Sequence, residues 1–223
     1  MHIFLDLDGP VLDVTRRYYL IYSDLLERAG YQPFDQKSYW SLKCLSVNEA
    51  AIVQRALPAE KIQTYLNQRS QMLEDPACLV HDRLQTGVFG VLERWQYQHS
   101  LHLVTLRRNR DALMSQLKLL GISAFFKSIH CADEGDANWQ AKCEWIRASG
   151  ADPDDALIIG DTEVDILAGR AAGIRTVAVS CGIRNCRLLN KLMPDAIVSS
   201  LDQVNDNILH DLPAQERGER ISA

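Results

Sequence analysis

The order of apolar and polar positions along the chain predicts strands that alternate with helices. Helix-period segments begin near Val88, Asn109, Asn138 and Glu163, and each lies between two short apolar runs. Because strands that alternate with helices of about ten to fifteen residues form βαβ units, the pattern predicts an α/β fold with a parallel sheet in a Rossmann-like three-layer core. The apolar runs that we expect as strands are 2–5, 101–105, 128–132, 156–160, 176–179 and 196–198.

The segment 14–80 interrupts this alternation and contains only helical patterns. One helix is expected over 15–29, a second opens at the capping-box pattern Ser46-Val-Asn-Glu49 and ends near Pro58, and a third covers 59–74. We therefore expect a small α-helical cap inserted after the first strand. The expected division is an α/β core over 1–13 and 82–212, a helical cap over 14–81, and a disordered polar tail over 213–223.

Composition narrows the class of protein. The chain has 223 residues and a net charge of −5 without a long Lys/Arg run, which gives no basis for nucleic-acid binding. The apolar runs fall short of the ~18 residues that a membrane span needs, and no secretory signal is visible, so we expect a cytoplasmic protein without a membrane partner. The six cysteines favour reduced thiols, although Cys181 and Cys186 leave a disulfide or zinc open.

Polar side chains follow several of the predicted strands. Asp6 and Asp8 come after the first strand, Thr105 ends the second, and Asp161 follows the run at 156–160, with Asp165 four residues later. Ligands of an open parallel sheet bind outside the carboxyl ends of its strands, so we expect these groups at one edge. Lys142, in the helix after the run at 128–132, is a candidate to join them.

Four clustered carboxylates predict a cation among them, because their charges would otherwise repel one another. An all-oxygen site suits Mg²⁺, which binds few carboxylates together with water and substrate phosphate. An Asp can accept a phosphoryl group covalently, and Thr105 and Lys142 would then hold the phosphate oxygens. The residues alone therefore point to phosphoryl transfer.

The run Asp6-Leu-Asp8-Gly9-Pro10-Val-Leu-Asp13 resembles the Asp-x-Asp-Gly-Thr-Leu-x-Asp first motif of the haloacid dehalogenase superfamily. Thr105 resembles the second motif of that family, Lys142 its third, and Gly160-Asp161-Thr-Glu-Val-Asp165 its fourth. The resemblance spans about residues 2–200. A helical insert between the first and second motifs is similar to the phosphoglycolate-phosphatase-like subclass.

The resemblance implies a role for each residue. Asp6 would be the nucleophile that forms an aspartyl-phosphate, and Asp8 would protonate the leaving oxygen and then activate water. Mg²⁺ would be bound by Asp6, Asp161 and the backbone carbonyl of Asp8, with Asp165 supporting the metal waters or Lys142. The substrate-binding residues would be Thr105, Leu106 and Lys142.

Two positions depart from the family pattern. Pro10 replaces the usual Thr after the motif glycine, which stiffens the loop and removes one N–H donor. Lys142 lacks the proline that often follows the third-motif lysine, and Lys127 is an alternative candidate for that role.

Several residues have a second interpretation. Asp161 can serve as a helix N-cap, and this role is compatible with metal binding. Arg107 and Arg108 are interpreted as solvated rather than substrate-binding. An aromatic stripe at helical spacing is usually core, and we interpret the aromatic residues of the insert in this way: Tyr18, Tyr19, Tyr22, Tyr39 and Trp40.

The function expected from these features is Mg²⁺-dependent hydrolysis of a small phosphate monoester that is phosphoglycolate-, sugar-phosphate- or nucleotide-like. A phosphomutase, a metal-free dehalogenase and a non-catalytic phosphate-binding module are the alternatives, although Asp8 argues against the dehalogenase. The ligand would be a small phosphorylated metabolite. The apolar face of the insert packs on the core or on a second copy, so a homodimer stays open.

Overall fold

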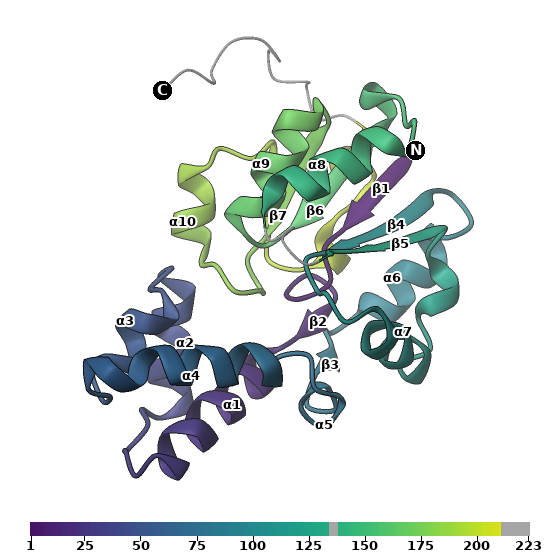
Figure 1. Ribbon diagram of the computed structural model, residues 1–223. Coiled ribbons are helices and arrows are strands. Elements are labelled where there is room, and N and C mark those ends of the chain that lie inside the picture. The colour runs from purple at the N-terminus through teal and green to yellow at the C-terminus, as the bar shows by residue number, and fades with distance from the viewer. Residues whose placement is uncertain (134–137, 211–223) are drawn as a thin grey trace.

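A computed structural model describes residues 1–133 and 138–210, and the tail expected over 213–223 lies outside these ranges. Figure 1 shows an α/β part with a group of helices beside it, and both links between the two parts run through the short strands β2 and β3. None of the helices in the described ranges is both long and apolar enough to cross a membrane.

The α/β part is built on a six-stranded parallel sheet, which confirms the expected fold class. The strand order is β5-β4-β1-β6-β7-β8, so β1 lies between β4 and β6. The register pairs Ile3 with Leu101 on one side and with Leu157 on the other. The strands are β1 (His2–Leu5), β4 (Ser100–Thr105), β5 (Ser128–Cys131), β6 (Ala156–Gly160), β7 (Arg175–Val179) and β8 (Ala196–Val198).

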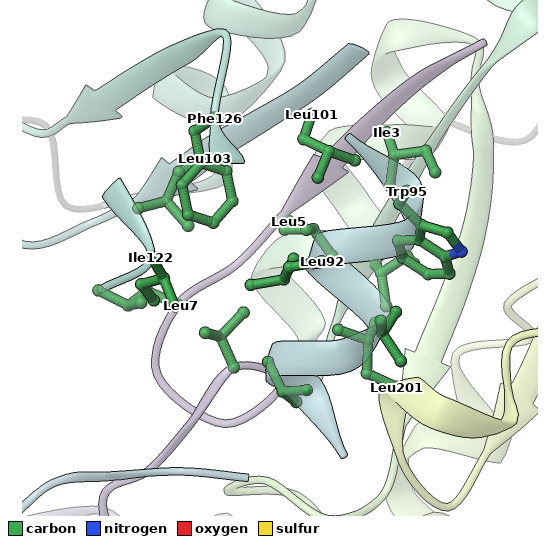
Figure 2. Packing of buried hydrophobic residues seen from close by; sticks show 14 of the residues in the cluster. Ile3, Leu5, Leu7, Leu92, Trp95, Leu101, Leu103, Ile122, Phe126 and Leu201 are labelled. Atoms are coloured by element: carbon green, nitrogen blue, oxygen red, sulfur yellow. The ribbon is translucent and has the colours of Figure 1, made fainter. Parts of the chain in front are cut away.

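Side chains alternate between the two faces of this sheet, as the pleat of a strand requires. Ile3 and Leu5 point to the face covered by α6 (Val88–Trp95) and α7 (Arg110–Leu119), where they pack with Leu92 and Trp95 (Figure 2). Phe4 points to the opposite face, which is covered by α8 (Trp139–Ala148) and α9 (Glu163–Ala172). Apolar layers on both sides fix the position of β1 and therefore of the loop that follows it.

The inserted helices have a hydrophobic cluster of their own, centred on Tyr22, Leu26, Tyr39 and Ile52. The stripe that includes Tyr22 and Tyr39 is core, as the sequence predicted. At the base of the insert, β2 (Leu12–Asp13) pairs antiparallel with β3 (Arg83–Leu84). The helices are α1 (Thr15–Arg28), α2 (Gln36–Cys44), α3 (Glu49–Val53), α4 (Ala59–Met72) and α5 (Pro76–Leu79).

The start of the second predicted helix is wrong. Ser46 does not cap it: Asn48 is the N-cap of α3, and its side chain accepts a hydrogen bond from the N–H of Ala51. Ser46 has a φ of 61° and belongs to the turn after α2, a helix that the sequence patterns did not predict. The boundaries expected between the α/β core and the cap, at 13/14 and 81/82, fall beside the β2–β3 pair. We keep this division into core and cap as a proposal.

The remaining short elements complete the α/β part. The Asn109 and Asn138 side chains cap α7 and α8, as their positions predicted, and Gly173 ends α9 in the left-handed conformation. All six cysteines are free thiols. The short elements are α10 (Cys186–Lys191), α11 (Asp206–His210) and the 3₁₀ turns η1 (Ser123–Phe125), η2 (Pro153–Asp155) and η3 (Leu201–Gln203).

A chain of imidazoles crosses the first strands of the sheet. His2 Nδ1 lies 3.0 Å from His102 Nε2, and His102 Nδ1 lies 2.8 Å from the Ser128 hydroxyl, which is 3.0 Å from His130 Nε2. The His102 ring stacks on Phe4 and is almost fully buried. Burial, together with the positive charges expected at His2 and Lys127, lowers the pKa of His102 to about 4.

This burial predicts acid sensitivity. Above pH 6.5 His102 is neutral in both the folded and the unfolded state, but between pH 6.5 and 4 only the unfolded state binds its proton. The free energy of unfolding should therefore fall with decreasing pH in that window, with His102 contributing at most about 1.4 kcal/mol per pH unit. Urea titrations across pH 4–7 should show a flatter dependence for His102→Gln than for the control His81→Gln; equal slopes would contradict this.

Candidate active site

Three neighbouring strands bring polar side chains to the same edge of the sheet. Asp6 follows β1, Asp161 follows β6, and Thr105 is the last residue of β4. The Asp6 N–H donates to the Ile159 carbonyl at 3.0 Å, so the pairing of β1 with β6 continues up to Asp6 itself. Because the strands are parallel, their carboxyl ends gather these side chains, as the sequence predicted for the edge of the sheet.

Lys142 joins two of the carboxylates. Its ammonium lies on α8, is buried, and donates at 2.6 Å to Asp6 Oδ1 and at 2.6 Å to Asp165 Oδ1. Burial opposes the charge, but the attraction of Asp165 and Asp6 outweighs it and raises the pKa of Lys142. Lys127, the alternative candidate, is exposed at the amino end of β5, at the opposite edge of the sheet.

Asp165 supports the turn at the start of α9. Its Oδ2 accepts from the N–H of Asp161 at 3.2 Å, the N–H of Thr162 at 3.1 Å and the Thr162 hydroxyl at 2.8 Å. The N-cap of α9 is therefore Thr162, with Asp165 completing a capping box, and not Asp161. Asp161 is thereby released from the capping role that the sequence also allowed.

Asp161 is fully buried in a close-fitting cradle. A Cβ added to Gly182 would lie 2.1 Å from Asp161 Oδ2, and one added to Gly9 would lie 2.3 Å from the same oxygen. The N–H of Ile183 donates to Oδ2, whereas the buried Oδ1 has no hydrogen-bond partner among the described residues. The absence of side chains at Gly9 and Gly182 therefore leaves room for this carboxylate, one of whose oxygens is unpaired.

The negative charges of this cluster exceed the positive charge of Lys142. Oxygens of Asp6, Asp161 and Asp165 all lie within 4.8 Å of one another. Burial, and then the charges of Asp6 and Asp165, raise the pKa of Asp161 well above its usual range. Burial raises the pKa of Asp6 to about 7 in spite of Lys142, with Asp165 and Asp8 adding to the rise. One ammonium does not compensate three carboxylates, and oxygen ligands at this spacing fit a hard divalent cation such as Mg²⁺.

Asp8 points into a different environment from Asp6. Its Oδ2 accepts from Arg17 Nη2 at 2.7 Å. Arg107 Nε donates to Asp8 Oδ1 at 3.1 Å and to Oδ2 at 3.2 Å, and Arg107 Nη2 also donates to Oδ1. Burial favours the neutral acid, but the charges of Arg107 and Arg17 hold the pKa of Asp8 well below its usual range. Asp8 is therefore an ionised hydrogen-bond acceptor in this arrangement.

The two arginines belong to a buried network that the sequence analysis missed. Asp82, on the link between α5 and β3, lies 3.0 Å from Arg17 Nε and 3.1 Å from Arg107 Nη2, and Gln116 of α7 donates to it at 2.9 Å. The interpretation of Arg107 as solvated is wrong, because its side chain is only 5% exposed. The one feature of the sequence that could have indicated this network is the place of Arg17 among the apolar positions of the first predicted helix.

A pocket of about 280 Å³ lies above these groups, between the insert and the sheet edge. Tyr18 and Arg17 contribute to its wall from α1, so Tyr18 is not solely a core residue. Asp161 and Asp165 are not among the residues that line it. Five residues predicted from the sequence do line it: Asp6, Asp8, Thr105, Leu106 and Lys142.

The insert contacts the α/β part on two sides of this pocket. Glu74 accepts from the backbone N–H groups of Arg108, at 2.9 and 3.0 Å, and Asn109, at 2.7 Å, before the start of α7. On the other side, Arg184 donates to the Lys43 carbonyl at 3.3 Å, and the Asn185 N–H donates to the Cys44 carbonyl at 3.2 Å. The carboxyl end of α2 therefore rests on the loop that also contacts Asp161.

The loop after Asp8 accommodates Pro10 without losing its own hydrogen bonds. Gly9, at a φ of 121°, donates its N–H to the Leu12 carbonyl at 2.9 Å, and Leu12 donates to Leu7 at 2.9 Å. The Gly9 carbonyl accepts from Gln85 Nε2 at 2.9 Å. The donor that Pro10 lacks is therefore not needed to close this turn.

The geometry agrees with what comparison to known proteins finds. The family model for haloacid dehalogenase-like hydrolases matches residues 3–179. A pyrophosphatase, PpaX, from Halalkalibacterium halodurans is 26% identical over 92% of this chain and 94% of its own. A phosphoglycolate phosphatase from Synechococcus elongatus is 28% identical over 89% of this chain and 92% of its own. The structure of a haloacid dehalogenase-like hydrolase from Streptococcus pneumoniae matches with a TM-score of 0.76 at 20% identity, covering 89% of this chain and 93% of that one.

The buried network predicts a large stability difference between two adjacent arginines. Arg17→Met leaves Asp8 and Asp82 without one of their two guanidinium partners, whereas Arg16 is exposed. We expect Arg17→Met to lower the free energy of unfolding by about 3–5 kcal/mol, the usual cost of removing one partner from a buried ion pair. Urea denaturation of Arg17→Met beside Arg16→Met measures this, and similar midpoints for both variants would show that the network does not stabilise the fold.

Proposed function

Because the chain belongs to the haloacid dehalogenase-like hydrolase family, as the match over residues 3–179 shows, we propose that it is a Mg²⁺-dependent phosphatase acting through an aspartyl-phosphate on Asp6. The observation that carries this proposal is the position of Asp6. Its carboxylate lines the pocket between the insert and the sheet edge, is held by Lys142, and lies beside Asp161 with its orphaned oxygen. The names of the relatives, a pyrophosphatase and a phosphoglycolate phosphatase, support hydrolysis of a phosphorylated small molecule.

In the first step, an Asp6 oxygen attacks phosphorus and the bond from phosphorus to the leaving oxygen breaks. Lys142 and the Thr105 hydroxyl, which both line the pocket, are positioned to hold the non-bridging phosphate oxygens. The hydrogen bond from Lys142 to Asp6 fixes which carboxylate oxygen faces away from the ammonium. Leu106 also lines the pocket and is proposed to contact the substrate.

In the second step, water attacks the aspartyl-phosphate and releases inorganic phosphate. Asp8 is the base that takes the proton from this water, and Arg17 and Arg107 keep it in the ionised form that a base needs. The same carboxyl group, once protonated, donates to the leaving oxygen in the first step of the next cycle. One carboxyl group therefore serves both proton transfers.

The proposed metal ligands are Asp6, Asp161 and the backbone carbonyl of Asp8, with Asp165 in support. Bound there, Mg²⁺ would cancel negative charge between the anionic nucleophile and the anionic phosphate. Asp165 has both oxygens engaged, one by Lys142 and one by the turn at Thr162, so its part is to hold these two groups in place. We also propose a small phosphorylated metabolite as the ligand and a cytoplasmic location.

The nucleophile assignment predicts that Asp6→Asn removes turnover. An amide is a poor nucleophile towards phosphorus, so release of inorganic phosphate from a panel of phosphorylated metabolites with Mg²⁺ should fall by at least about 10³-fold. Asp13→Asn, an exposed aspartate of the same segment, is the matched control and should retain activity. If Asp6→Asn releases phosphate at the wild-type rate, Asp6 is not the nucleophile.

The cradle around Asp161 predicts a metal-binding defect from a single methyl group. Gly182→Ala places a Cβ on the Asp161 carboxylate, so that the carboxylate has to move. We expect the Mg²⁺ concentration for half-maximal phosphate release to rise at least about tenfold. Gly90→Ala, in α6, meets only the end of the Arg94 side chain at 3.9 Å and should not change it. An unchanged Mg²⁺ titration in Gly182→Ala would argue against Asp161 as a ligand.

A further inference from the structure

The side-chain amide of Gln85 joins two loops that meet at Asp161. Gln85 directly follows β3, and its Nε2 donates to the Gly9 carbonyl at 2.9 Å and to the Cys181 carbonyl at 3.3 Å. These carbonyls belong to the Asp6 loop (6–11), which follows β1, and to the 180–185 loop, which lies between β7 and α10. Gln85 is not among the residues that line the pocket, so its amide contacts the loops and not the substrate.

The main chain of Gln85 is fixed to the Asp6 loop as well. The pairing of β2 with β3 sets Leu12 opposite Leu84. The Gln85 N–H extends this pairing by donating to the Val11 carbonyl at 2.9 Å. The backbone of Gln85 is therefore held two residues away from Gly9, whose carbonyl its side chain binds.

The same two loops form the walls around the Asp161 carboxylate. Gly9 lies in the Asp6 loop and Gly182 in the 180–185 loop, and a Cβ added to either would lie 2.3 Å or less from Asp161 Oδ2. The Gln85 amide binds the carbonyl of Gly9 itself and that of Cys181, the residue before Gly182. The amide therefore helps to set the distance between the two walls that confine Asp161.

The other contacts at this place tie the loops together less firmly. The Cys181 thiol points to the same Gly9 carbonyl at 3.7 Å, and a thiol is a weak hydrogen-bond donor. The Ile183 N–H donates to Asp161 from the 180–185 loop and does not reach the Asp6 loop. In the part of the chain that the structure describes, the Gln85 amide is therefore the main hydrogen-bonding link between the two loops.

Asp161 depends on this confinement because its surroundings repel it. It is fully buried, and oxygens of Asp6 and Asp165 lie within 4.8 Å of its own. A wider space between the walls would let the carboxylate move away from these charges. Mg²⁺ demands near-ideal octahedral geometry with oxygen ligands at about 2.0–2.1 Å, whereas Ca²⁺ accepts irregular geometry at about 2.3–2.6 Å. A less confined Asp161 should therefore weaken the binding of Mg²⁺ more than that of Ca²⁺.

We propose that Gln85 is a positioning residue of the metal site, whose amide holds the Asp6 loop and the 180–185 loop at the spacing that orients the Asp161 carboxylate for Mg²⁺. This inference rests on the proposed function, because it takes Asp161 as a metal ligand. It adds a residue that contacts neither the metal nor the substrate. Loss of a group that orients a metal ligand typically costs about 10- to 100-fold in metal affinity.

The test measures metal binding without substrate or turnover. The melting temperature is followed as Mg²⁺ or Ca²⁺ is added, because an ion that binds only the folded state raises it by mass action. Each titration gives a dissociation constant, and the metal-free sample gives the stability of the fold. Gln85→Met keeps the approximate length of the side chain and removes the amide. We expect it to raise the dissociation constant for Mg²⁺ at least about tenfold, and that for Ca²⁺ much less.

A second variant and a matched control assign the effect to the N–H donor of Gln85. Gln85→Glu keeps the shape of the side chain but has no N–H at about pH 8, where a carboxyl group is ionised. Its added charge attracts both cations alike, so the preference for Mg²⁺ over Ca²⁺ should still fall, and this variant gives the result if Gln85→Met is too unstable to titrate. Gln98→Met removes an exposed amide between α6 and β4 and should leave both dissociation constants unchanged.

The outcomes separate this inference from the proposed function. If the wild-type protein binds Mg²⁺ and releases phosphate while both Gln85 variants keep its preference for Mg²⁺, the inference fails and the phosphatase stands. If the Gln85 variants lose that preference but the wild-type protein hydrolyses no compound, the positioning role stands and the phosphatase fails. Equal weakening of both cations indicates a general loss of structure and overturns the inference, as does a wild-type melting temperature that does not respond to Mg²⁺.

Discussion

The site depends on the contacts of one buried ammonium, that of Lys142, with two carboxylates. A buried ammonium costs several kcal/mol unless its charge is compensated, and here Asp6 and Asp165 compensate it at 2.6 Å each. Asp6 comes from the end of β1, Asp165 from α9 and Lys142 from α8, so three elements have to be in place together. The apolar layers on both sides of the sheet set these elements in position. The ion pairs with Lys142 then fix the orientation of the two carboxylates at the carboxyl ends of the strands.

The distribution of charge follows from that arrangement. The three acids around Lys142 exceed the positive charge available to them, and the two arginines around Asp8 and Asp82 match the charge of those acids. Within the insert, two cations, Lys43 and Arg69, share one acid, Glu49.

Much of the sheet edge could be predicted from the sequence. Apolar runs identify the strands, and the polar residues that directly follow them must then lie at the carboxyl ends of those strands. Asp6, Thr105 and Asp161 were placed correctly at this edge for that reason. The network of Arg17, Asp82 and Gln116 could not be predicted in this way. Its members are separated by as many as 99 residues, and their pairing depends on how the insert sits on the sheet rather than on any local period.

The errors within the insert have a local cause. Ser46 and Asn48 are both good N-cap residues, and only the end of α2 decides between them, because Ser46 is used in the turn that closes that helix. The segment of α2, Gln36–Cys44, is mostly polar and buries only Tyr39, so its periodicity is weak. The polar face of this helix is turned towards the solvent and towards the loop of Arg184.

Contacts with the insert also hold the proposed catalytic groups in place. Moving the insert away from the sheet would separate Arg17 from Asp8, Glu74 from the N–H groups before α7, and the end of α2 from the Asn185 loop. The first of these contacts holds Asp8, the proposed general base, and the last belongs to the same loop that donates to Asp161 through Ile183. A displacement of the insert would therefore change the contacts of Asp8 and of the loop at Asp161 together.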